Sequence, residues 1–131
     1  MRDRGIVVVA AAAAVAAAIV AGLAYLDGAK PVLQERKVVA IFKTSSESNA
    51  FWAALRDGVE SGAQDYGLDV TIRAPRDEKY VDEQIAIVEE AIAAAPAAIV
   101  LAAGDYQRLV GPVRKAKEAG IKVVCVDSFI A

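Results

Sequence analysis

Short apolar runs alternate with amphipathic stretches through most of the chain beyond residue 36. The apolar runs, at residues 38–42, 68–73, 98–102 and 122–126, have the length and composition of strands in a buried parallel sheet. Between them, apolar residues recur at the three- and four-residue spacing of helices that bury one face. These helical positions are Phe51, Leu55, Val59, Gly62 and Tyr66; Val81, Ile85, Val88 and Ile92; and Leu109, Val113, Ala116 and Gly120. The alternation predicts an α/β fold: a three-layer, doubly wound parallel sheet with strand order 2-1-3-4.

Glycine and proline mark the ends of the predicted helices. Gly67 and Gly120 each follow a helical stretch and precede an apolar residue, as a glycine with positive φ does after a helix. Pro96 ends the second helix, because it lacks a backbone N–H and restricts the backbone of Ala95. The three helices are therefore bounded by their own sequence.

The amino-terminal segment differs in composition from the rest. Three of the first five residues are charged, whereas residues 6–26 carry no charge. This run exceeds the roughly 7–15 apolar residues of a signal peptide and reaches the roughly 20 of a transmembrane helix. Its length favours an apolar membrane anchor, whereas its alanine content and small residues at 22–24 and 27–29 leave a cleaved signal peptide open. We therefore expect a signal or anchor at 1–26, a polar linker at 27–36 and a folded domain at 37–131.

Composition excludes several classes of function. The chain contains no histidine, which excludes Ser/His/Asp triads and other mechanisms that need a histidine acid or base. Its net charge is −2 and it has no basic patch, so we expect no nucleic-acid partner. The single cysteine, Cys125, lies in an apolar run, where we expect a buried, inert thiol.

An aromatic pair after the first predicted strand is the chief candidate for a binding site. Asn49, Phe51 and Trp52 lie where a helix begins, and open α/β sheets bind ligands just beyond the carboxyl ends of their strands. The rings could stack on a flat apolar ligand face. The alternative is that both rings pack in the core, which we favour less for Trp52 than for Phe51. Because adjacent helical residues do not share a face, one ring should point outward.

A series of motifs runs in order through residues 37–128. Residues 48–52 read Ser-Asn-Ala-Phe-Trp, 57–59 read Asp-Gly-Val, the second helix carries Gln84, Val88 and Glu89, and further segments lie at 98–101, 109–113 and 119–128. The series resembles the amino-terminal lobe of type I periplasmic binding proteins, in the sugar-binding branch that includes the ribose- and galactose-binding proteins of ABC importers. The first motif is similar to that family's Asn-Pro-Phe-Phe or Asn-Pro-Phe-Trp loop. The resemblance implies a flavodoxin-like lobe that binds a solute without catalysis, cofactor or metal.

The resemblance also implies which residues bind the ligand. In that family the asparagine and aromatic pair of the first loop contact the sugar, and an aspartate after the fourth strand binds its hydroxyls. The matching positions are Asn49, Phe51, Trp52 and Asp127. Ser128 stands where ribose-type proteins have an arginine, which leaves the identity of the sugar open. Asp105, after a glycine that replaces a common asparagine, should cap the third helix through the N–H of residue 107 or 108, unless the ligand is within its reach.

The function implied is that of an exported, membrane-tethered substrate-binding protein, in the periplasm or at the outer face of the cell membrane, that presents a sugar or polyol to an ABC permease. The alternative is a sensory domain that reports the ligand to a membrane receptor. Since the sequence covers one of the two lobes that close on a ligand, we expect this lobe alone to bind weakly. A dinucleotide-binding enzyme is disfavoured because no Gly-x-Gly-x-x-Gly motif follows the first strand.

Overall fold

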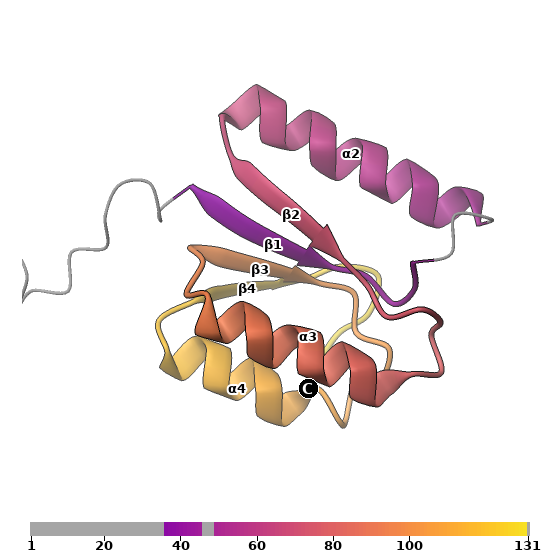
Figure 1. The fold of residues 1–131 in the computed structure, drawn as a ribbon, viewed down its shortest axis with the longest axis vertical. Coiled ribbons are helices and arrows are strands. Elements are labelled where there is room, and N and C mark those ends of the chain that lie inside the picture. The colour runs from indigo at the N-terminus through magenta and orange to yellow at the C-terminus, as the bar shows by residue number, and fades with distance from the viewer. Residues whose placement is uncertain (1–35, 46–48, 131) are drawn as a thin grey trace, which may run out of the picture. The chain divides into compact units, whose positions relative to one another are not determined.

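The structure, a computed structural model, describes residues 36–45 and 49–130. This part of the chain contains four parallel strands and three helices in alternation (Figure 1). Their bounds are β1 Lys37–Ile41, α2 Ala50–Tyr66, β2 Asp69–Arg73, α3 Val81–Ala93, β3 Ala98–Leu101, α4 Val110–Glu118 and β4 Lys122–Cys125. The sheet order is β2-β1-β3-β4, which confirms the predicted order 2-1-3-4.

The predicted apolar segment 6–26 lies outside the described residues, as does all but the last residue of the predicted linker 27–36. Within residues 36–45 and 49–130, no helix is both long and apolar enough to cross a membrane. The strands and helices above all belong to the predicted domain 37–131.

Helices cover both faces of the sheet, which produces the three layers expected from the sequence. Helix α2 lies on one face, and α3 and α4 lie on the other (Figure 1). On the α2 side, Ala40 and Phe42 share a core cluster with Trp52. Ile41, between them in the chain, belongs to the opposite core cluster together with Val88 of α3. Burial on both faces explains why β1 is apolar at successive positions.

The helices end as the sequence predicts at two places and differently at the third. Gly67 and Gly120 have φ values of 63° and 77°, which confirms their role after α2 and α4. After α3, Ala95 takes this left-handed conformation with φ 49°, and its N–H donates to the Ile92 carbonyl at 3.0 Å. Pro96 does follow the helix end, but an alanine there adopts a backbone that glycine adopts with less strain.

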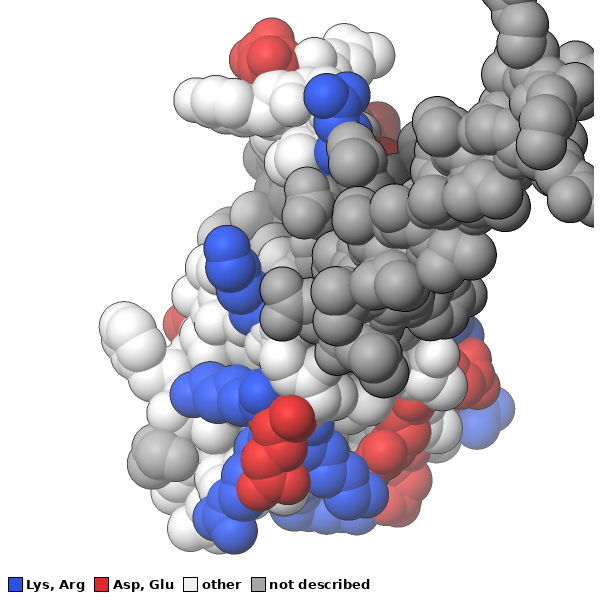
Figure 2. Space-filling view, turned by 90° about the vertical axis from the view of Figure 1, so that its left-hand side faces the viewer, with Lys and Arg blue, Asp and Glu red and all other residues white. Residues whose placement is uncertain are grey.

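Helix α3 pairs its acidic side chains with cations from the elements on either side of it. The pairs are Asp82–Arg108, Glu83–Arg76 at 3.3 Å, Glu89–Lys115 at 2.7 Å and Glu90–Arg73 at 2.7 Å. All four are open to solvent, so each adds little to stability. Figure 2 shows the side of the molecule with the amino ends of the strands, where blue basic and red acidic groups lie next to one another on the lower part.

Candidate ligand-binding site

Asn49, the first of the predicted binding residues, lies directly before α2 and caps it. Its backbone is extended, with φ −98° and ψ 112°, and its Oδ1 accepts a hydrogen bond from the Phe51 N–H at 2.9 Å. This bond satisfies one of the free N–H groups at the helix N-terminus. Asn49 is exposed, so it starts α2 at the carboxyl end of β1 and remains accessible from solvent.

The two aromatic residues point in different directions, as predicted, but the preference between them was wrong. Trp52 is 6% exposed and lies with its ring centroid 5.9 Å from that of Phe42 in the core. Phe51 is 52% exposed and meets Trp52 edge to face, with ring centroids 4.9 Å apart. Phe51 therefore offers an open ring at the edge of the sheet, and the buried Trp52 ring packs against it.

The cause of this reversal is the orientation of α2. The predicted buried face included Phe51 and Tyr66, yet Tyr66 is 81% exposed. The side that faces the sheet carries Trp52, Leu55, Val59 and Ala63. Both sets fit a helical period, so packing against Phe42 rather than spacing decides which one is buried.

Asp127 lies just after β4 and forms an ion pair with Lys43, which lies just after β1. Lys43 Nζ is 2.6 Å from Asp127 Oδ2, and Ser128 Oγ donates to the same carboxylate oxygen at 3.2 Å. The Lys43 hydrogen bond lowers the pKa of the Asp127 carboxyl from its usual value, although partial burial acts in the opposite direction. Asp127 is therefore ionised at neutral pH, with a cation beside it.

Lys43 is a residue that the sequence did not single out. Because β3 separates β1 from β4 in the sheet, the Lys43–Asp127 pair spans the carboxyl end of β3. Asp127 itself has a φ of 62°, a left-handed conformation that aspartate tolerates better than most residues. The available signal for Lys43 was its place directly after the first strand, combined with the predicted strand order.

The Gln84 side chain, on α3, links the two central strands, β1 and β3, at the carboxyl edge of the sheet. It is 1% exposed, and its Nε2 donates to the carbonyls of Phe42 at 2.9 Å and Ala102 at 2.8 Å. Its Oε1 accepts the Gly104 N–H at 2.8 Å. A Cβ at position 104 would lie 3.1 Å from this Oε1, so glycine allows the close approach. The chain segments that carry Lys43 and Asp105 are thus fixed to one buried amide.

Asp105 accepts the two hydrogen bonds predicted for it, but it caps the turn before α4 and not the helix, whose N-cap is Leu109. Its Oδ1 accepts the backbone N–H groups of Gln107 and Arg108, each at 2.9 Å. Residues 106–109 form a turn, and α4 itself begins at Val110. The carboxylate therefore holds the loop after β3, and a contact between Asp105 and a ligand stays a prediction.

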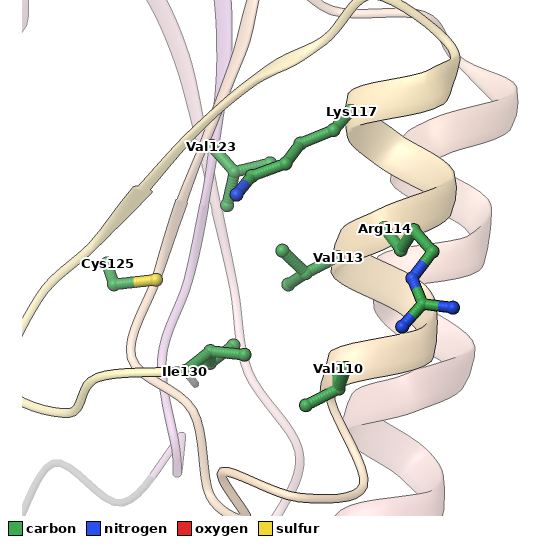
Figure 3. Close-up of a pocket in the computed structure, with 7 residues that line it drawn as sticks. All are labelled: Val110, Val113, Arg114, Lys117, Val123, Cys125 and Ile130. Carbon is green, nitrogen blue, oxygen red and sulfur yellow. The ribbon is translucent and has the colours of Figure 1, made fainter.

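The structure also contains a cavity between α4 and β4, lined by none of the predicted binding residues (Figure 3). Its volume is about 240 Å³, and it is lined by Val110, Val113, Arg114, Lys117, Val123, Cys125 and Ile130. In Figure 3, Val110 and Val113 point from α4 toward Ile130, and Lys117 extends toward Val123. Cys125 is partly exposed, so the prediction of a buried thiol was wrong. A second cavity of about 220 Å³ lies between α2 and the sheet and is almost entirely apolar.

Known proteins of similar sequence and structure bind sugars. A D-ribose/D-allose-binding protein of Pseudomonas aeruginosa is 33% identical over 85 residues, which are 63% of this chain and 27% of that protein. The crystal structure of a sugar transporter from Clostridium phytofermentans matches with 34% identity and a TM-score of 0.68, over 70% of this chain and 34% of that one. An ABC transporter solute-binding protein from Agrobacterium vitis with bound D-fucose matches with 31% identity and a TM-score of 0.68, over 72% and 32%.

The chain thus spans about a third or less of the length of these relatives. A family defined by a periplasmic binding protein domain matches residues 38–131, which include every strand and helix described above apart from Lys37, the first residue of β1. On this match the chain belongs to the periplasmic binding protein family, and its similarity to the D-ribose/D-allose-binding protein and to the sugar transporter places it with the sugar-binding members.

Proposed function

We propose that this lobe is part of an exported solute-binding protein that binds a sugar or polyol for an ABC importer. The observation that carries the proposal is the Lys43–Asp127 ion pair, at the edge of the sheet where Asn49 and Phe51 also lie. Ligands of open α/β sheets bind at this edge. The position of the pair therefore matches a ligand site better than a purely structural ion pair in the core.

The chemistry of these side chains suits a neutral, polyhydroxylated molecule. The Asp127 carboxylate accepts hydrogen bonds from hydroxyl groups, and the Lys43 ammonium donates to them. Their charges cancel, so the pair does not select for a charged solute. The exposed Phe51 ring packs against the C–H face of a sugar ring, and Ser128 and Asn49 supply further donors and acceptors.

The wider role follows from relatives such as the Agrobacterium vitis ABC transporter solute-binding protein with bound D-fucose. We infer an extracytoplasmic location, with residues 6–26 as the export signal or membrane anchor, and an ABC permease as the protein partner. Nothing in the described residues favours the sensory alternative over transport. Because one lobe encloses only part of a ligand, binding by this chain is expected to be weak.

The test is saturation-transfer NMR on the full chain in detergent micelles, with D-ribose, D-allose and D-fucose as separate probes. This method detects weak binding, and we expect saturation of the C–H protons of at least one sugar. Asp127→Asn and Phe51→Ala should abolish the signal. The control Asp69→Asn changes an exposed carboxylate at the amino end of β2 and should leave the signal unchanged. Absence of saturation transfer for all three sugars would overturn the proposal.

A further inference from the structure

Three exposed aromatic rings follow three strands of the sheet at its carboxyl edge. Phe51 follows β1 and is 52% exposed, Tyr106 follows β3 and is 57% exposed, and Phe129 follows β4 and is 88% exposed. Parallel strands bring these loops to one edge, to which all four strands point in Figure 1. Exposed aromatic side chains gathered in one place mark an interaction site. The proposed sugar site accounts for Phe51 but not for Tyr106 or Phe129.

Tyr80, in the loop after β2, shows how a ring at this edge can be covered by the protein itself. The Arg76 guanidinium lies 4.0 Å from the centroid of the Tyr80 ring, and Lys79 Nζ lies 5.2 Å from it. Cations over an aromatic face are attracted by its negative charge distribution. Within residues 36–45 and 49–130, neither Tyr106 nor Phe129 has a cation or a second ring over it.

Both open rings are carried by backbone that the structure holds in place. Tyr106 follows Asp105, whose carboxylate accepts two backbone N–H groups of the same turn. Phe129 lies between Ser128, whose N–H donates to the Val126 carbonyl at 2.6 Å, and Ile130, which packs against the core. Fixed backbone on each side means that a ligand does not have to order these loops when it binds.

The loops that carry Tyr106 and Phe129 begin side by side. Strands β3 and β4 pair directly, with Leu101 opposite Cys125, so the chain leaves both strands at adjacent points. The carboxylate of Asp127 lies in the second of these loops, and its partner Lys43 reaches it from β1 across the end of β3. The ion pair therefore lies at the ends of the three strands whose loops carry Phe51, Tyr106 and Phe129.

We propose that Tyr106 and Phe129 form a second apolar surface of the ligand site, and that the ligand is a glycoside: a sugar that carries an apolar group or a second sugar ring. The inference rests on the proposed function. Phe51 and the ion pair hold the first sugar ring, and the Tyr106 and Phe129 rings pack against the attached group. A free monosaccharide fills the first part of this site and leaves the second part in water.

The test compares methyl and phenyl β-D-glycosides of ribose, allose and fucose by NMR titration of the full chain in detergent micelles. We expect the phenyl glycoside of the preferred sugar to bind roughly tenfold more tightly than the methyl glycoside, from stacking on the two rings. Tyr106→Ser and Phe129→Ser should each weaken phenyl glycoside binding by roughly threefold to tenfold and leave methyl glycoside binding unchanged. The control Tyr66→Ser removes an exposed ring at the other end of α2 and should change neither.

The outcomes separate this inference from the function on which it rests. Equal affinity for methyl and phenyl glycosides would overturn the inference and leave the proposed sugar binding intact. Unchanged phenyl glycoside affinity in both serine variants, with unchanged Trp52 fluorescence as evidence of folding, would overturn it as well. Failure of every glycoside to bind, with saturation transfer to a free sugar retained, would overturn this inference alone. Failure of the free sugars as well would overturn both proposals.

Discussion

Replacement of Gln84 by methionine removes the amide that joins β1 to β3 while keeping a side chain of similar length and volume. The carbonyls of Phe42 and Ala102 lose their side-chain donor, and the Gly104 N–H loses its acceptor. Phe42 and Ala102 are both 0% exposed, so water does not replace the lost donor without local opening. Gly104 is exposed and can turn its N–H toward water.

The expected loss follows from these three groups. An unsatisfied buried backbone group costs about 1–3 kcal/mol, and the accessible Gly104 N–H costs less. We therefore expect Gln84→Met to lower the free energy of unfolding by about 3 kcal/mol, a large part of the roughly 5–15 kcal/mol typical of a folded domain. The carboxyl ends of β1 and β3 should also be held together less firmly, because the Gln84 side chain bridges them.

The assay is urea unfolding of the full chain in detergent micelles, followed by the fluorescence of Trp52. This is the single tryptophan of the chain and is 6% exposed, so unfolding transfers it from the core to water. Gln64→Met, on the exposed side of α2, is the matched control and should change the free energy of unfolding by less than about 0.5 kcal/mol. A loss below about 1 kcal/mol for Gln84→Met, or an equal loss for the two variants, would refute the reasoning.

Three further predictions concern stability. The Lys43 contact lowers the pKa of Asp127, so the stabilising effect of this ion pair should be complete above the unfolded-state pKa of about 3.9 and be lost as pH falls below it. The difference in unfolding free energy between wild type and Asp127→Asn, measured against pH, should therefore shrink at low pH. A difference that stays constant with pH would contradict this. Ala95→Gly should raise the free energy of unfolding by about 0.5–1 kcal/mol by relieving the positive φ. Ala93→Gly, at the last residue of α3, should instead lower it by up to about 1 kcal/mol; equal effects at the two positions would show that the φ value is irrelevant. Trp52→Ala should cost about 3–5 kcal/mol and Phe51→Ala less than about 1 kcal/mol, measured by circular dichroism during urea unfolding; similar losses would contradict the assignment of Trp52 to the core.

The strand order was predictable because its determinants are local. Four apolar runs separated by helical periods require parallel strands, and the handedness of crossovers then leaves few arrangements of helices on the two faces. The glycines at 67 and 120 show the same principle, since a positive φ after a helix has a local sequence signature.

The site was less predictable because its contacts join distant parts of the chain. Spacing alone does not distinguish Phe51 from Trp52 as the buried ring, since each begins a plausible helical stripe, and contact with Phe42 makes the choice. The Lys43–Asp127 pair requires knowledge that β1 and β4 end at the same edge with β3 between them. Gln84 had one local signal, a polar residue within the apolar stripe of α3, and its three backbone partners come from elsewhere in the fold.

The most direct test of the central claim is a map of sugar-induced shifts in the ¹⁵N–¹H spectrum of the full chain in detergent micelles, titrated with D-ribose, D-allose and D-fucose. The account predicts that the backbone amides of Lys43, Phe51, Asp127 and Ser128 shift with at least one sugar, and that those of Val113 and Val123 in the α4–β4 cavity do not. Shifts concentrated at Val113 and Val123, or no shifts with any of the three sugars, would contradict a sugar site at the carboxyl edge of the sheet.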